Sequence, residues 1–313
     1  MNPASPSGLL SLILMMGGCS TLPPASTSFS PAEVIAFVES TGLNEISGLA
    51  ASHRNDGIFW THNDSGAAPE LHAINREGKT VATLAITNAT ARDWEDISSF
   101  ELNGEPWLLI ADVGDNGSIR DDTVLYLLPE PALSLGPNVE KISAPATRTL
   151  KFSFEDGPRD CEGVAVCPNT CEILLISKRT EPPVLYTLPL LEKDIDRSQP
   201  LVAKRISPLV GVVPPTSIER AIPGRLGQYR SNVTAFDLAP DSSAAVVLTY
   251  GNIWLYRRGR FDSWAKALSR QPERIPVRGL PQAEALCFSP DSSELWITTE
   301  STRAPIQRYQ LKS

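Results

Sequence analysis

Apolar and polar positions along this chain alternate in short runs that are typical of β-strands. Pairs of apolar runs are separated by polar turns, and no helical periodicity interrupts the series. Many short strands with turn signals between them predict an all-β domain, which can be a sandwich, a barrel or a propeller. A search for internal repeats is the way to choose between these folds.

A divergent repeat runs through most of the chain. Copies begin at Glu45, Glu95, Glu162 and Glu284, and each opens with Glu and a short apolar run, followed by a polar turn and a second apolar run. A further copy begins at Thr234, where "LAPDSS" matches the "FSPDSS" of the last copy, but it lacks the Glu. A third strand follows each pair, and a fourth follows in four of these copies. Repeated four-stranded units predict a β-propeller with five blades.

The two ends of the repeat region complement each other. The last copy reaches Ser313 without a fourth strand, whereas the strand-like segment Glu33–Ser40 precedes the first copy without a partner. We expect this segment to complete the last blade and to close the ring, which leaves no open sheet edge. A long insertion at 208–232 is either a loop over one face or a concealed blade, so six blades are the alternative. Residues 33–313 are therefore expected to form a single propeller domain.

The N-terminal segment has a different pattern. Leu9–Met16 is an apolar run of eight residues, which suits the core of a signal peptide and is too short for a membrane span. Gly17, Gly18 and Cys19 follow, and this arrangement resembles a bacterial lipobox. The resemblance implies cleavage of a signal peptide at 1–18 and lipidation of the Cys19 thiol.

We expect the lipid at Cys19 to hold the protein in the cell envelope, with an ordinary secreted protein as the alternative. Residues 19–32 are rich in Ser, Thr and Pro, which is typical of a flexible tether. Ser20 after the cysteine indicates the outer membrane, facing the periplasm, if the cell is Gram-negative. The membrane would be contacted through the lipid alone, and the domain is expected to be a monomer.

Charge and cysteine content narrow the possible partners. A formal net charge of −8 argues against a nucleic-acid partner, because a basic surface is needed to neutralise phosphates. Four cysteines remain besides Cys19, and "CPNTC" places Cys167 and Cys171 on either side of a turn between two strand-like runs. A hairpin disulfide between these two cysteines is expected, with two reduced thiols as the alternative.

The carboxylates of "RDWEDI", Arg92 to Ile97, are one part of a larger predicted cluster. In a propeller, the start of the first strand of each blade and the end of the second lie on the same face. The four Glu that open the repeats should therefore gather at the channel mouth, with Asp93, Asp96 and Asp160 beside them. The ends of the second strands add further polar residues to this face: His62, Asn63, Asp64, Asp112, Asp115, Asn116, Lys178, Arg179 and Glu300.

Four Glu around a narrow channel favour a bound cation, because their charges repel one another in a partly buried site. Oxygen ligands in this number suit Ca²⁺, so the sequence predicts a calcium site formed by Glu45, Glu95, Glu162 and Glu284. Asp96 or Glu162 is the expected general base, and His62 is a further catalytic candidate. Polar residues at the strand ends are expected to hold the substrate: Asn63, Asp64, Asp115, Asn116, Lys178 and Arg179. The alternative is that the acids pair with Arg and Lys and have only a structural role.

Several of these motifs resemble a known family. "EISGLA", "HNDSG", "DWEDI", "GDN" and "DCEGV", spread over residues 40–310, resemble secreted bacterial propeller proteins that are classed as phytase-like or esterase-like. The resemblance implies a β-propeller related to calcium-dependent hydrolases. We therefore expect a calcium-dependent hydrolase of a small anionic ester, with a phosphoester or a lactone as the bond that is cleaved. The alternative is a non-catalytic propeller that binds a peptide, a glycan or another envelope component, with structural calcium.

Overall fold

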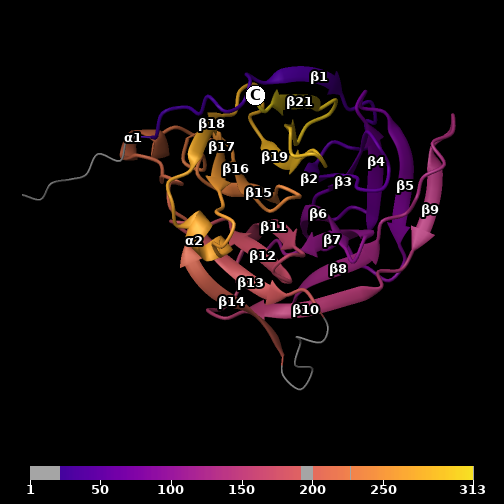
Figure 1. Ribbon diagram of the computed structural model, residues 1–313, viewed down its shortest axis with the longest axis horizontal. Helices are drawn as coiled ribbons and strands as arrows, with labels where there is room; N and C mark the ends of the chain where they lie inside the picture. Colours follow the sequence, from indigo (N-terminus) through magenta and orange to yellow (C-terminus); the bar gives the residue numbers. More distant parts are fainter. Residues whose placement is uncertain (1–21, 192–199, 226, 313) are drawn as a thin grey trace, which may run out of the picture.

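The computed structural model describes residues 22–191, 200–225 and 227–312. Within these residues the protein is all-β, as predicted, and its sheets are arranged around a common centre (Figure 1). The two helices of the described part are single short turns, α1 (Ser217–Arg220) and α2 (Trp264–Leu268). Neither of these helices is long and apolar enough to cross a membrane.

The first half of the chain forms two sheets. The first sheet has five strands in the order β2 (Ile46–Ala51), β3 (Ile58–Asn63), β4 (Glu70–Asn75), β5 (Thr80–Ile86) and β9 (Glu140–Ala144). The second has eight strands in the order β6 (Trp94–Leu102), β7 (Glu105–Asp112), β8 (Thr123–Pro129), β10 (Arg148–Phe154), β14 (Leu201–Pro208), β13 (Val184–Pro189), β12 (Glu172–Ser177) and β11 (Cys161–Cys167). Parallel pairing of β10 with β14 joins two antiparallel units of four strands within this larger sheet.

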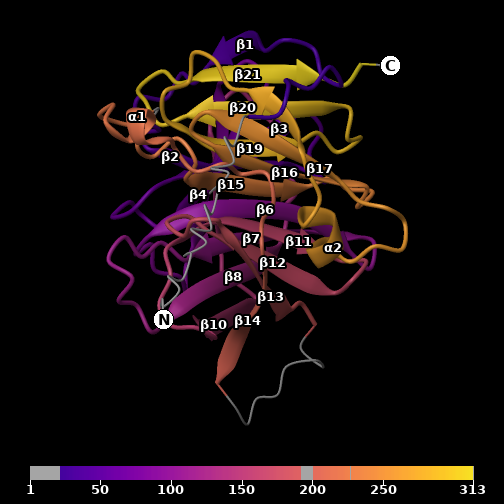
Figure 2. The same cartoon turned by 90° about the vertical axis from the view of Figure 1, so that its left-hand side faces the viewer.

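The second half of the chain forms two further sheets of four strands. One has the order β15 (Val233–Leu238), β16 (Ala244–Thr249), β17 (Asn252–Arg257) and β18 (Glu273–Pro276). The other has the order β19 (Ala283–Phe288), β20 (Glu294–Thr299), β21 (Pro305–Gln310) and β1 (Glu33–Phe37). Figure 2 shows β1 and β21 at one side of the molecule and β10 and β14 at the opposite side.

The innermost strands contact one another in chain order around the centre. Strand β2 packs beside β6, β6 beside β11, β11 beside β15, β15 beside β19, and β19 returns to β2. Every residue of β2, β11 and β19 is buried, because these strands have other strands on both sides. Apolar side chains fill the space between neighbouring sheets, as where Phe59 of β3 packs against Trp296 of β20 with ring centroids 4.9 Å apart. This is a β-propeller-like arrangement.

The N-terminal strand pairs with the last strand of the chain, as the sequence predicted. Strand β1 runs antiparallel to β21, with Glu33 opposite Arg308, and these two side chains form an ion pair of 2.7 Å. The pairing brings sequence-distant segments into one sheet and covers the outer edge of β21. Val38, just after β1, is fully buried in the core beside this sheet.

The described part of the expected tether, residues 22–32, lies along the surface of the domain. The backbone amide of Ser26 donates to the carbonyl of Arg274 at 2.6 Å, and the amide of Lys312 donates to the carbonyl of Ser28 at 2.8 Å. Phe29 is buried against β-sheet residues of the core, and the Ser26 hydroxyl donates to the Glu273 carboxylate. These contacts fix the segment, so the described part of 19–32 is not the free linker that its composition indicated. Cys19 lies outside the described residues.

Two further expectations concern the insertion and the cysteines. The described residues of 209–232, here called the insertion, contribute α1 and loops but no strand after β14. The four cysteines of the described part are free thiols, so the predicted bridge between Cys167 and Cys171 is not formed. The reason is local, because the Cys167 thiol is directed at the hydroxyl of Ser242 whereas the Cys171 thiol is directed back at the carbonyl of Pro168.

Candidate functional site

Each innermost strand begins with a break in its pairing register. In β6 the break falls between Trp94 and Asp96, so Glu95 is the bulged residue. Glu162 of β11 and Glu284 of β19 occupy the same position, and Ser47 and Thr234 are the corresponding residues of β2 and β15. A β-bulge redirects the side chain of the extra residue and is common beside functional sites. Three carboxylates from distant parts of the chain are thereby brought to one place.

Glu45 is not part of this group. It is exposed, precedes β2 and does not line the cavity that the other three Glu share. Ser47 takes its place, and its hydroxyl lies 3.3 Å from a carboxylate oxygen of Glu95. The repeat alignment matched Glu45 with the other Glu because all four precede apolar runs. The bulge position, however, is the second residue of each strand.

The three Glu open onto a cavity of about 290 Å³ at the centre of one face, here called the site cavity. Predicted residues and unpredicted residues both line it. In the described part of the chain, the lining residues are Asp64, Glu95, Asn116, Glu162, Lys178, Arg179, Arg225, Tyr229, Asn232, Tyr250, Glu284 and Glu300. Five carboxylates and three cations make this lining strongly polar. The cavity is suited to a small charged molecule and not to an apolar one.

The insertion and the residue directly after β16 supply the lining residues that were not predicted from the sequence. Arg225, Tyr229 and Asn232 belong to the insertion, which has no counterpart in the other repeats. Tyr250 directly follows β16, just as Lys178 follows β12 and Glu300 follows β20. Alignment of the ends of the second strands is therefore a signal that could have revealed Tyr250.

Two of the three Glu are neutralised by cations of the chain. The Lys178 ammonium forms an ion pair with Glu162, and both side chains are buried. Burial alone would lower the pKa of Lys178, but the charges of Glu162, Tyr250 and Glu95 raise this pKa above its ordinary value. Lys178 therefore remains a cation inside the cavity.

Glu284 has its own set of partners on the other side of the cavity. Its Oε1 accepts hydrogen bonds from Nη1 of Arg225 at 2.5 Å and from the hydroxyl of Tyr250 at 2.6 Å. The same Nη1 of Arg225 reaches Oε2 of Glu300 at 2.9 Å. One guanidinium therefore bridges two carboxylates, because a single nitrogen carries two N–H donors.

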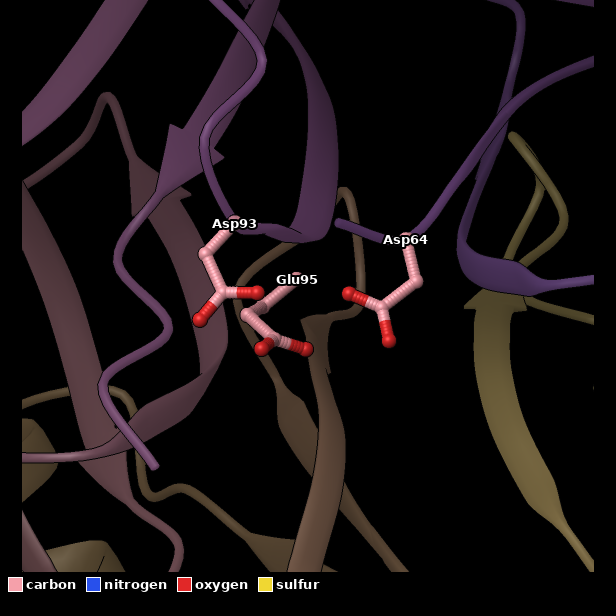
Figure 3. Close-up of side chains that lie close together, drawn as sticks. All are labelled: Asp64, Asp93 and Glu95. Carbon is pink, nitrogen blue, oxygen red and sulfur yellow. The ribbon is translucent and has the colours of Figure 1, made fainter. Parts of the chain in front are cut away.

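Glu95 differs because it lies among other acids. Asp64, Asp93 and Glu95, here called the acidic cluster, each place a carboxylate oxygen within 4.8 Å of the others (Figure 3). In the described part of the chain, none of these three carboxylates forms an ion pair. Burial raises the pKa of Glu95 well above its ordinary value, and the charge of Glu162 adds to the shift. Burial and the charge of Asp64 raise the pKa of Asp93 to about 6.

A second group of carboxylates is already paired. Glu95, Asp160 and Glu162 also approach one another within 4.8 Å, and all three are buried. However, Asp160 accepts a 2.5 Å hydrogen bond from Nε of Arg179 and a 2.9 Å bond from the backbone amide of Asp115. With Glu162 paired to a lysine as well, this second group has little negative charge left to attract a cation.

Asp96 is buried and does not line the site cavity. Its carboxylate accepts hydrogen bonds from the backbone amides of Val164 at 2.8 Å and Phe236 at 3.3 Å. These bonds tie β6 to β11 and β15, so the side chain supports the inner strands. Burial raises its pKa well above the ordinary value, although its amide partners oppose this shift.

His62 is also buried outside the cavity. Its Nδ1 donates to the carbonyl of Asn63 at 3.0 Å, and burial lowers its pKa to about 4. The side chain of Asn63 donates to the carbonyl of Gly42 at 2.7 Å, and the Asp115 carboxylate accepts from the backbone amide of Arg120 at 2.8 Å. These three residues brace the loops around the site instead of lining it.

Comparisons with known proteins found no match to any family model and no match among curated proteins. Solved structures with partial similarity include U3-55K, at 13% identity over 85% of this chain and 68% of that chain, with a TM-score of 0.39. A luciferin-regenerating enzyme matches at 14% identity over 85% of this chain and 77% of its own, with a TM-score of 0.41. A PQQ-bound aldose sugar dehydrogenase from Streptomyces coelicolor matches at 10% identity over 93% of this chain and 100% of its own, with a TM-score of 0.45. Similarity this weak identifies neither a family nor an activity.

Proposed function

We propose that this protein binds Ca²⁺ at the acidic cluster and hydrolyses a small anionic ester in the adjoining site cavity. The observation that carries the proposal is the uneven pairing of the three bulge Glu. Glu162 is paired with Lys178 and Glu284 with Arg225, whereas Glu95 is surrounded by Asp64 and Asp93. A cluster of carboxylates with raised pKa values is stabilised by a cation.

The donor set of the acidic cluster fits calcium. Three carboxylates carry six oxygens, and Ca²⁺ takes 6–8 oxygen ligands in flexible geometry. No sulfur or imidazole nitrogen belongs to the cluster, which argues against a thiophilic metal. Asp93 takes the place of Glu45 in the set of ligands that the sequence predicted, and Glu162 and Glu284 contribute to the cavity wall.

The residues of the cavity have separate roles in the proposed ester hydrolysis. When bound, Ca²⁺ supplies a Lewis acid that polarises the scissile oxygen and acidifies water. Glu162 lines the cavity and is the carboxylate best placed to accept a proton from water, since its ion pair with Lys178 engages only Oε1. Lys178 and Arg179 provide positive charge for the anionic part of the substrate. Asp96 and His62 support the strands and loops around the cavity and do not contact the substrate.

The second candidate is a non-catalytic propeller that binds a peptide, a glycan or an envelope component on the same face. It is favoured by the mutual pairing of Glu284, Glu300 and Arg225, which is also typical of a rigid binding surface. In this case calcium would hold the acidic cluster together without taking part in a reaction. The two candidates differ in whether the ligand is consumed.

We also propose the architecture and location that the sequence predicted. Five innermost strands contact in a closed cycle, which supports five blades, with the eight-stranded sheet counted as two blades joined by β10 and β14. Pairing of β1 with β21 supports closure by the N-terminal strand. The signal peptide, lipid on Cys19, the envelope location and the monomeric state are part of the same proposal.

Thermal unfolding with and without a chelator tests the calcium site. We expect the chelator to lower the Tm of the wild type, because removing a ligand of the folded state leaves the acids uncompensated. Glu95→Gln should largely abolish the response, whereas Glu45→Gln should behave as wild type because Glu45 is exposed outside the cavity. A wild-type Tm that does not respond to chelator would remove the calcium proposal.

Hydrolysis is tested separately with p-nitrophenyl phosphate and a simple lactone, each with Ca²⁺ and with chelator. We expect calcium-dependent turnover of one of the two bonds, and a loss of at least about tenfold in kcat for Glu162→Gln, since general bases contribute about 10²–10⁴-fold. Calcium binding without turnover of either probe would favour the binding propeller.

A further inference from the structure

Among the described residues, the insertion carries the one cation of the site cavity that does not come from a repeat. It is braced by its own contacts, since Glu219 of α1 forms a 2.8 Å ion pair with Arg230 and caps the helix through Thr216. Arg220 anchors the insertion to Glu181 with a 2.6 Å ion pair. Between these anchors, Arg225 reaches into the cavity. The insertion is therefore built to hold this side chain over the site.

The guanidinium of Arg225 is fixed on one side and open on the other. Among the described residues, only its Nη1 has hydrogen-bond partners, which are Glu284 and Glu300. The guanidinium carbon lies 5.2 Å from the ring centroid of Tyr250, whose hydroxyl also bonds to Glu284. The contact with the Tyr250 ring and the hydrogen bonds of Nη1 together orient the Arg225 guanidinium. Nε and Nη2 are left to make paired, parallel bonds to two oxygens of an anion.

We propose that Arg225 is the specificity-determining residue that recognises the anionic group of the ligand. This inference rests on the proposed function, because it takes the ligand to be a small anion. The anionic group is a phosphate or a carboxylate, since both present two oxygens at the spacing of a guanidinium fork. Arg225 lines the same cavity as Asp64 and Glu95 of the acidic cluster. One ligand in this cavity can thus contact both a cation held by the cluster and the fork of Arg225.

The net charge of the lining explains why an anionic ligand needs a cation with free donors. The lining has five carboxylates and three cations, so its net charge is −2 when all are ionised. An anion would be repelled unless it met a cation whose donors are directed at it. Arg179 uses the Nε and Nη2 edge of its guanidinium on Asp160 and Asn116, and the Lys178 ammonium, which has no planar fork, is paired with Glu162. Among the described residues, the same Nε and Nη2 edge of Arg225 has no hydrogen-bond partner.

Isothermal titration with inorganic phosphate tests the inference, in Ca²⁺ and again after chelation. The variants are Arg225→Gln, which loses the charge, and Arg225→Lys, which keeps the charge but loses the fork. Arg220→Gln is the matched control, because it removes an equal charge from the same insertion at an exposed ion pair, and exposed pairs contribute little to stability. We expect phosphate affinity to fall at least about tenfold in Arg225→Gln, by less in Arg225→Lys, and to stay unchanged in Arg220→Gln.

Three results would overturn the inference: equal phosphate affinity in wild type and Arg225→Gln, an equal loss in Arg220→Gln, or no phosphate binding by the wild type. The variant Arg225→Lys keeps a positive charge beside Glu284 and Glu300. It therefore tests the role of the fork in phosphate binding even if Arg225→Gln does not fold. A parallel Ca²⁺ titration separates this inference from the proposed function. If Ca²⁺ binds normally but phosphate affinity does not depend on Arg225, only the inference about Arg225 is wrong. If phosphate binds through Arg225 but Ca²⁺ does not bind, only the calcium proposal is wrong.

Discussion

Gly114, in the loop after β7, lies against the acidic cluster. A Cβ atom on Gly114 would lie 2.2 Å from Oε1 of Glu95 and 2.5 Å from Oδ2 of Asp93. Its backbone conformation is open to any residue, since it is not among those with positive φ. The demand for glycine therefore comes from the two carboxylates and not from the turn.

The substitution Gly114→Ala is expected to push Glu95 and Asp93 apart, because the new methyl group overlaps both side chains. We expect weaker Ca²⁺ binding and a destabilisation of about 1–3 kcal/mol, which is typical of overpacking in a buried site. Calcium titration and chemical unfolding measure the two effects. Gly117→Ala is the control, since a Cβ there meets its nearest atom, on Ile119, at 3.5 Å. Similar calcium affinities for both variants would contradict the close approach.

At the scale of the elements, aspartates of the inner strands hold these strands to one another. Asp237 of β15 accepts hydrogen bonds from the backbone amides of Leu238 and Phe288, both at 2.8 Å, and the second bond joins β15 to β19. Asp96 forms the comparable links from β6. Burial raises the pKa of Asp237 from 3.8 to about 7, even though both amide partners lower it.

This raised pKa predicts how stability depends on pH. Between about pH 4 and pH 7 the folded state binds a proton at Asp237 that the unfolded state has lost, so the stability that it provides falls as pH rises. Asp237→Asn removes this titration. The stability of the variant relative to wild type should therefore increase by about 1–4 kcal/mol across this window, measured by urea unfolding at each pH. A difference that is constant with pH would show that Asp237 keeps an ordinary pKa.

The N-terminal strand makes a second prediction for an element. Deleting residues 1–31 removes the docked segment and the buried Phe29, whereas deleting residues 1–41 also removes β1 and Val38. Each buried apolar side chain contributes about 1.5–3 kcal/mol, and loss of β1 exposes the edge of β21. We expect a lower Tm for the first deletion, and a much lower Tm with self-association for the second. Scanning calorimetry and size-exclusion chromatography give the two readouts, and equal Tm values for both deletions would exclude a role for β1.

Strand patterns were predictable from the sequence because each repeat has to bury both faces of its inner strands. Apolar runs located the first strands, and the unpartnered segment at Glu33 correctly located the strand that pairs with β21. The position of Glu95, Glu162 and Glu284 followed from the same alignment. The alignment placed Glu45 wrongly, because a bulge arises from pairing with a neighbouring strand and cannot be seen in the local pattern of hydrophobic residues.

Other parts of the site depend on contacts between distant segments. Arg225 lies in an insertion without internal repeats, so no alignment could place it, and it meets Glu284 and Glu300 only in the folded protein. The roles of Asp96 and His62 were misplaced for a related reason. Asp96 lies beside Glu95 in the sequence, but alternation along a strand directs neighbouring side chains in opposite directions. His62 is fully buried, with its ring against Trp94 at a centroid distance of 5.7 Å.

At the scale of the whole molecule, the docked segment 22–32 sets how far the domain can stand from a membrane. Its contacts with Arg274 and Lys312 hold the chain from Leu22 onward against the sheets. Only residues 20 and 21 separate Leu22 from Cys19. Three peptide steps span about 10 Å when fully extended. With lipid on Cys19, the domain would rest beside the bilayer on the side where β18 and the N-terminal segment meet.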